Sequence, residues 1–168
     1  MHTKIRYKRE VLFQALLLIF FSSCQTAKLS QWHLQKDHGS HQAFNFIRIY
    51  YPPKDVNSGL ELEFASNSSG FSSYINVFSE KIPMYQNDPE KALLTIKTEK
   101  KELNFIVHRL KGEQRLLLTK KQTTFLEESL KGEREIHLFL DGYEESISSK
   151  GFLPLLKRLK KSISKNLS

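Results

Sequence analysis

The chain of 168 residues lacks several features that would point directly to a function. Its single cysteine, Cys24, excludes an internal disulfide framework and a zinc site built on several thiolates. Its seven glycines are scattered singly, so no glycine-rich loop for phosphate is present. No apolar run of about 18 residues occurs, which excludes an ordinary transmembrane helix. Apolar residues make up 39% and charged residues 26%, and this balance indicates one globular domain.

The first 24 residues are typical of a secretory signal peptide. A positive segment comes first, with Lys4, Arg6, Lys8 and Arg9. An apolar stretch follows from residue 11 to 21, interrupted only by Gln14, and then two serines precede Cys24. Such a stretch spans only about half of a hydrocarbon core of about 30 Å, which is too short for a permanent spanning anchor.

The sequence Phe21-Ser22-Ser23-Cys24 resembles the lipobox of bacterial lipoprotein precursors. In that family a diacylglycerol is attached to the cysteine sulfur, the preceding peptide is removed, and the new N-terminus is acylated. The resemblance implies that Cys24 is the lipidation site, with S-diacylglycerol and an N-acyl chain, and that residues 1–23 are removed. Phe21 departs from the usual leucine of the family. The resemblance covers residues 1–24 alone, and we recognise no family for the mature domain.

The same resemblance implies a location in the cell envelope, anchored in a membrane by lipid. In lipoproteins of diderm bacteria an Asp after the cysteine tends to keep the protein in the inner membrane. Gln25 stands there in this chain, which favours the outer membrane, on its periplasmic side or surface, if the host has one. Two alternatives remain: Cys24 could be an inert cysteine in an N-terminal helix, or cleavage could follow Ala27.

Removal of residues 1–23, which carry four basic residues and one acidic residue, lowers the formal net charge from +8 to +5. A modest positive charge favours attraction to anionic surfaces. Together with an exported location, it argues against nucleic acid as a partner. The expected partners are membrane lipid, through Cys24, and an envelope protein, peptide or polymer of unknown identity. We expect no cofactor.

Composition divides the mature chain in two. Residues 24–41 are polar and without helix or strand period, and predict a lipidated N-terminus and tether in which only Trp32 and Leu34 could fold back onto the domain. Residues 42–168 predict a single domain. Its expected strands, from β-branched, aromatic or alternating residues, are 44–51, 60–64, 73–78, 92–98, 103–110, 115–118 and 135–140.

Two helices are also expected. Thr119 and Gln122 fit a capping box that starts the first, and Gly132 fits its end. Strands joined by short turns are antiparallel, because a parallel pair needs a crossover of about a dozen residues. The predicted fold class is therefore α+β, an antiparallel β-meander or open sandwich of about six to seven strands with two helices.

The last helix, from about residue 151 to 163, is basic and amphipathic. Its apolar side is formed by Phe152, Leu155, Leu156, Leu159 and Ile163. Its opposite side carries Lys157, Arg158, Lys161 and Lys165. The apolar stripe could cover the open sheet, or the helix could lie on an anionic membrane surface. We favour docking, because an open sheet needs an apolar cover.

Residues with ligand chemistry gather in the tether. His33, Asp37, His38 and His41 fall within nine residues, and imidazole and carboxylate are good zinc or copper ligands. The three histidines are candidate metal ligands. A flexible tether does not supply the fixed geometry and outer hydrogen bonds of a metal site, so we expect a polar linker and no metal.

Candidate catalytic residues are few. His108 and His137 fall in expected strands, and either could activate a Ser or pair with an Asp. Asp141, Glu144 and Glu145 lie at a turn without the spacing of a calcium loop. No nucleophile-elbow sequence is present, so we assign no catalytic residue.

Tyrosines at expected strand ends or turns give a further hypothesis. Tyr50, Tyr51, Tyr74, Tyr85 and Tyr143 could form a platform for sugar or peptide, or could belong to the core and its rim.

The sequence thus favours a membrane-anchored envelope lipoprotein that is a non-enzymatic binding or structural module. The alternative is a small lipid-anchored hydrolase or metal-handling protein that uses His108, His137 or the tether histidines. The alternative requires a histidine and a carboxylate or hydroxyl to converge in a pocket.

Overall fold

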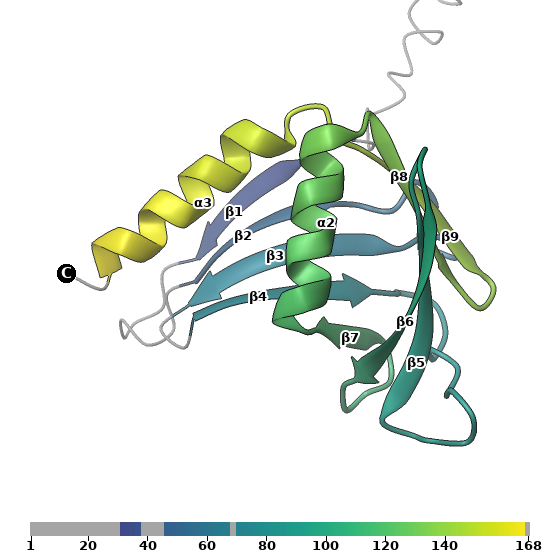
Figure 1. Ribbon diagram of the computed structural model, residues 1–168. Helices are drawn as coiled ribbons and strands as arrows, with labels where there is room; N and C mark the ends of the chain where they lie inside the picture. Colours follow the sequence, from purple (N-terminus) through teal and green to yellow (C-terminus); the bar gives the residue numbers. More distant parts are fainter. Residues whose placement is uncertain (1–30, 38–45, 68–69, 167–168) are drawn as a thin grey trace, which may run out of the picture.

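The computed structural model describes residues 31–37, 46–67 and 70–166 (Figure 1). These residues form one antiparallel sheet and two helices. The strands are β1 (His33–Asp37), β2 (Phe46–Tyr51), β3 (Glu61–Asn67), β4 (Gly70–Asn76), β5 (Lys91–Lys97), β6 (Glu102–Arg109), β7 (Arg115–Leu118), β8 (Glu135–Leu140) and β9 (Tyr143–Ser148). The helices are α2 (Lys120–Gly132) and α3 (Phe152–Asn166).

The nine strands lie in the order β1-β2-β3-β4-β7-β6-β5-β8-β9. The chain runs as a meander through β1 to β4, reaches β5, and returns through β6 to β7, which pairs with β4. Helix α2 then carries the chain back past β6 and β5 to β8.

The start of α2 follows the predicted chemistry. Thr119 caps the helix through its side-chain oxygen, which accepts a hydrogen bond from the Gln122 N–H, and the Gln122 side chain accepts the Thr119 N–H at 2.8 Å. The C-terminal end of α2 differs from the expectation that Gly132 stands just after the helix. This glycine is the last helical residue, and the helix ends at Glu133, in extended conformation, whose N–H donates to the Ser129 carbonyl.

Both helices cover the same face of the sheet (Figure 1). Helix α2 contacts β4, β7 and β8, and α3 contacts β2 and β3. Phe152, Leu156 and Leu159 of α3 are buried against the sheet, and Leu155 is half-buried. Docking on the sheet is therefore confirmed for the apolar stripe of this helix. The side chain of Ile163 lies outside the described part of the structure.

The α+β class and the antiparallel sheet are confirmed, but the strand number of six to seven is wrong. Nine strands are hydrogen-bonded into one open sheet. The two strands beyond the seven expected ranges, β1 and β9, are the two edges of the sheet. Strand β1 also takes residues 33–37 out of the segment assigned to the tether.

The two edges come close to each other because the sheet curves. Trp32, just before β1, donates its indole N–H to the Ser148 carbonyl of β9 at 2.7 Å, and its ring lies 4.7 Å from that of Phe152. Along β9, the Glu144 N–H donates to the Ser58 carbonyl at 3.1 Å. Partners outside the strands thus satisfy backbone groups of the β9 edge, which protects it from pairing with another chain.

Candidate functional site

The structure describes only some of the residues singled out from the sequence. Residues 1–23, Cys24, His38 and His41 lie outside the described residues. His33 lies in β1, where its ring stacks on Tyr50 with centroids 5.3 Å apart. Within the described ranges, no group of three His, Cys, Asp or Glu side chains is placed to hold a metal ion.

The second face of the sheet, opposite the helices, carries no helix among the described residues; we call it the open face. Cross-strand pairing places one side chain from each of seven strands in a continuous line along it. This central row consists of His33, Tyr50, Glu63, Tyr74, Leu117, His108 and Lys91. It brings His33 and His108 onto the same face, but at distant strands. The two histidines therefore do not form one site.

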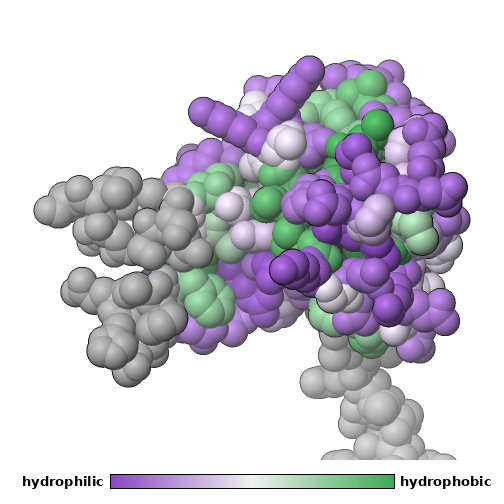
Figure 2. All heavy atoms as spheres, turned by 90° about the horizontal axis from the view of Figure 1, so that it is seen from below, coloured by the Kyte–Doolittle hydropathy of each residue, from purple (hydrophilic) through white to green (hydrophobic). Residues whose placement is uncertain are grey.

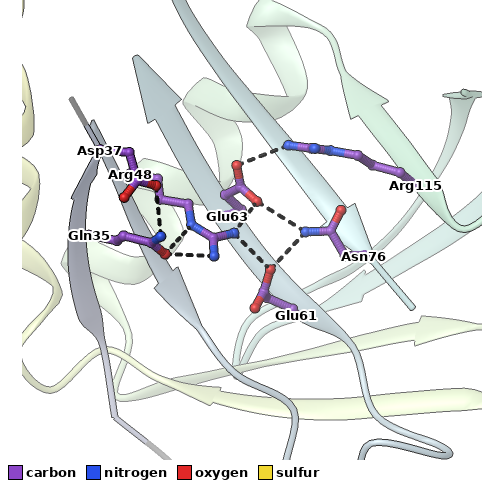
Figure 3. Close-up of polar contacts among 7 residues, drawn as sticks. All are labelled: Gln35, Asp37, Arg48, Glu61, Glu63, Asn76 and Arg115. Carbon is purple, nitrogen blue, oxygen red and sulfur yellow. Dashed lines mark hydrogen bonds and ion pairs between the residues drawn. The ribbon is translucent and has the colours of Figure 1, made fainter. Parts of the chain in front are cut away.

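A carboxylate cluster occupies the centre of the open face (Figure 3). Glu63 accepts hydrogen bonds from Arg48 at 3.0 Å, Arg115 at 2.9 Å and Asn76 at 3.2 Å. Glu61 accepts from Asn76 at 2.8 Å. Glu61 is 6% and Glu63 4% exposed, although no helix covers this face. The flanking guanidinium and amide groups bury them.

The arginines of the cluster are held by more than the carboxylates. Gln35 accepts two hydrogen bonds from Arg48, at 2.8 and 2.9 Å, and itself donates to Asp37 (Figure 3). Arg48 lies over the ring of Tyr50, 4.5 Å from its centroid, and Arg115 lies 3.8 Å from that of Tyr74. Charge-assisted hydrogen bonds and cation–π contacts together fix both guanidinium groups.

The electrostatics of the cluster differ from those of a solvated surface. Burial raises the pKa of the Glu61 carboxyl above its ordinary value, against the opposing effects of the Asn76 hydrogen bond and the Arg48 charge. A buried polar group costs free energy unless it is paired, and here each carboxylate is paired. The cluster is thus a rigid, preorganised surface.

Apolar side chains continue the open face beyond the cluster. Leu93 of β5 and Ile106 of β6 are cross-strand partners and remain exposed. On the side of the molecule seen in Figure 2, hydrophobic residues form a broken band bordered by hydrophilic side chains. Exposed apolar groups beside fixed polar groups are typical of binding surfaces.

The tyrosines divide between the two alternatives. Tyr50 and Tyr74 lie half-buried in the central row, on either side of Glu63. Tyr51 and Tyr143 are buried in the core, and Tyr85 lies in the loop before β5. The platform hypothesis therefore applies to two residues.

Among the candidate catalytic residues from the sequence, His137 is the one that lies next to both a hydroxyl and a carboxylate in the described structure. Its Nδ1 lies 2.8 Å from the Ser146 hydroxyl, and its Nε2 lies 3.3 Å from the Glu135 carboxylate. Ser146 and Glu135 line a pocket of about 760 Å³ beside β9. Sequence reasoning missed the pairing with Ser146, because β9 itself was not predicted.

The same pocket contains two of the three carboxylates predicted at the turn after β8, whereas Asp141 is exposed and does not line it. Glu144 lines it from the surface, and Glu145 is buried on the core side, where its carboxylate accepts the Lys54 N–H at 2.8 Å. Burial raises the pKa of the Glu145 carboxyl. Gly59 is required here, because a Cβ at this position would lie 2.6 Å from the Glu145 carboxylate. The acidic side chains of the turn therefore diverge and form no joint site.

Comparisons with known proteins identify no relative: no family model, no curated protein and no solved structure matches the chain. Neither helix of the described residues is long and apolar enough to cross a membrane.

Proposed function

We propose that the chain is a lipid-anchored lipoprotein of the bacterial envelope that acts as a non-enzymatic binding module, with the open face as its binding surface. The anchor is supported by the lipobox-like sequence that ends at Cys24. The binding role is supported by the open face, where the ion-paired centre, two tyrosines and the Leu93–Ile106 pair adjoin. The ligand class is an envelope protein, peptide or polymer.

The central row is the observation that carries the binding role. Seven neighbouring strands place aromatic, charged and apolar side chains in one line. Its centre is held rigid by Arg48, Glu63 and Arg115. A rigid surface loses little side-chain entropy when a ligand binds, which favours affinity. An extended partner that crosses the strands fits such a row.

The anchor is tested at Cys24. Intact-mass analysis of membrane-extracted protein should show loss of residues 1–23 and added acyl mass. Cys24→Ala should leave the protein unprocessed or released from the membrane, because two or more acyl chains are needed for stable anchoring. Normal processing and full membrane retention of this variant would overturn the anchor.

The binding surface is tested by cross-linking in native membranes. A photo-reactive residue at position 106, on the open face, should capture a discrete partner, whereas one at Thr124, exposed on α2, should not. Tyr50→Ala combined with Tyr74→Ala should remove the product while the fold is retained. Equal products from both positions would contradict a role for the open face.

The alternative function, a hydrolase, has the Ser146–His137–Glu135 arrangement in its favour. Two observations oppose it. Glu135, Glu144 and Asp55 line the pocket, where they would repel a developing oxyanion, and the Ser146 N–H already donates to the Glu145 carboxylate. Labelling of Ser146 by a fluorophosphonate, lost in Ser146→Ala, would support the hydrolase and contradict a purely non-enzymatic role.

A further inference from the structure

Helix α3 presents a basic surface on the side that faces away from the sheet. The helix contains five basic residues and no acidic residue. With Phe152, Leu156 and Leu159 buried against the sheet, the exposed side carries Lys157 and Arg158. Neither of these two makes an ion pair with any described residue. Leu153, 39% exposed, lies on the same outward side.

One positive charge of α3 is already used within the fold. Lys160 donates to the Glu127 carboxylate of α2 at 2.6 Å. The buried stripe of Phe152, Leu156 and Leu159 sets which side of α3 faces outward, and this ion pair joins the helix to α2 at its flank. The outward group of Leu153, Lys157 and Arg158, which we call the basic face, thus has a fixed orientation on the domain.

The chain enters the domain beside this helix. Trp32, the second described residue, contacts Phe152, the first residue of α3. Only six residues lie between Cys24 and Gln31, and the seven steps from one to the other span at most about 25 Å when fully extended. The helix itself, with 15 residues, is about 22 Å long. A lipid at Cys24 therefore holds the N-terminal end of α3 within about its own length of the membrane surface.

We propose that the basic face of α3 lies on anionic phospholipid headgroups of the membrane that holds the anchor, so that the open face of the sheet is directed away from it. This inference rests on the lipid anchor of the proposed function. Basic segments next to a lipid anchor bind anionic membranes, and the two contacts reinforce each other. A second copy of the chain fits this surface poorly, because two basic faces repel each other.

The anchor itself makes a clean labelling experiment available. Cys24 is the only cysteine, and thioether-linked lipid blocks its thiol. Leu153→Cys and, as control on the open face, Ile106→Cys therefore each introduce one reactive thiol at an exposed position. Each full-length lipidated variant is labelled with an environment-sensitive fluorophore. Each is then reconstituted into vesicles of phosphatidylcholine alone or with about 30% phosphatidylglycerol, which supplies the anionic surface.

Headgroup-linked nitroxide lipids should quench the label at position 153 at least about threefold more than the label at position 106 in anionic vesicles. The difference should disappear in neutral vesicles and in about 0.5 M salt, where exposed charges are screened. Equal quenching at the two positions in anionic vesicles, with the protein still bound to them, would overturn the orientation and leave the anchor intact.

Charge reversal gives the matched control. Lys157→Glu with Arg158→Glu should abolish the excess quenching at position 153, whereas Lys120→Glu with Lys121→Glu, exposed at the start of α2, should leave it unchanged. Both pairs change the net charge equally. If both double variants lose the excess quenching equally, net charge alone attracts the protein to the membrane. That result would contradict a specific contact through the basic face. If the protein does not bind vesicles and Cys24 also reacts with the label, then Cys24 carries no lipid. That result would overturn both the anchor and this inference.

Discussion

The two faces of the sheet bury their side chains in opposite ways. On the helix-covered face, Ile49, Leu62 and Phe64 are fully buried beneath α3 and Trp32. On the open face of the same strands, Glu61 and Glu63 are nearly as buried, with no helix over them. Apolar side chains need a cover from elsewhere in the chain, whereas carboxylates can be covered by long arginines of neighbouring strands.

This difference has an energetic consequence. Apolar burial is non-directional and stabilises the covered face in proportion to the area removed from water. The carboxylate cluster is directional, because each charge depends on particular partners at hydrogen-bond distance. We expect substitutions on the covered face to unfold the domain and substitutions on the open face to change local geometry and binding.

The largest effect is expected on the covered face. Leu159→Asp places a charge where α3 meets the sheet, and should lower the free energy of unfolding by about 4 kcal/mol or more. Urea denaturation measures this loss. Leu153→Asp, an exposed position on the same helix, is the control and should unfold close to wild type. Similar stability of both variants would contradict docking of α3.

A smaller loss is expected at the centre of the open face. Glu63→Gln preserves the shape of the side chain but removes the charge that Arg48 and Arg115 share. The free energy of unfolding should fall by about 1–3 kcal/mol, measured by urea denaturation. If the variant is as stable as wild type, the arginines are sufficiently hydrated without Glu63, and the cluster does not rigidify the face.

The pH dependence of Glu61 sharpens the same comparison. Because burial raises its folded-state pKa, its contribution to stability is greatest when it is protonated and falls as the pH rises through the raised pKa. Glu61→Gln does not titrate at this position. The free energy of unfolding of the variant minus that of wild type should therefore be larger at pH 7 than at pH 4. Denaturation curves of both proteins at each pH measure this difference. A difference that does not vary with pH would contradict the burial effect.

The smallest effect on stability is expected at Ile106. Ile106→Ser removes an exposed apolar group from the open face and should change the free energy of unfolding by less than about 0.5 kcal/mol. Cross-linking through a photo-reactive residue at Leu93, its neighbour, should weaken in this variant. Unchanged capture would show that the Ile106 side chain does not contribute to binding the ligand.

Sequence patterns predicted the central strands and both helices because burial leaves a period. The alternation Leu60, Leu62, Phe64 corresponds to the covered face of β3, and the capping box at Thr119 starts α2. The edge strands leave less pattern. Strand β1 has mostly half-buried side chains, and β9 places Glu145 in a core position where alternation predicts an apolar residue.

The carboxylate cluster was beyond prediction for a related reason. Alternation alone places Glu61 and Glu63 on a solvated face. Their burial depends on Arg48, Asn76 and Arg115, which come from three other strands. Their alignment follows from the pairing register of β2, β4 and β7, and no local spacing in the sequence reveals that register.

Trp32 also determines how the domain bears mechanical load. If a lipid holds Cys24, any pull between membrane and ligand enters the domain at Trp32, before it reaches the β1–β2 ladder. The indole is hydrogen-bonded to Ser148, and its ring contacts Tyr51, Phe64 and Phe152. These contacts distribute the force to both edges of the sheet and to α3. Edge strand β1 can therefore peel away only after the indole has been pulled from the core.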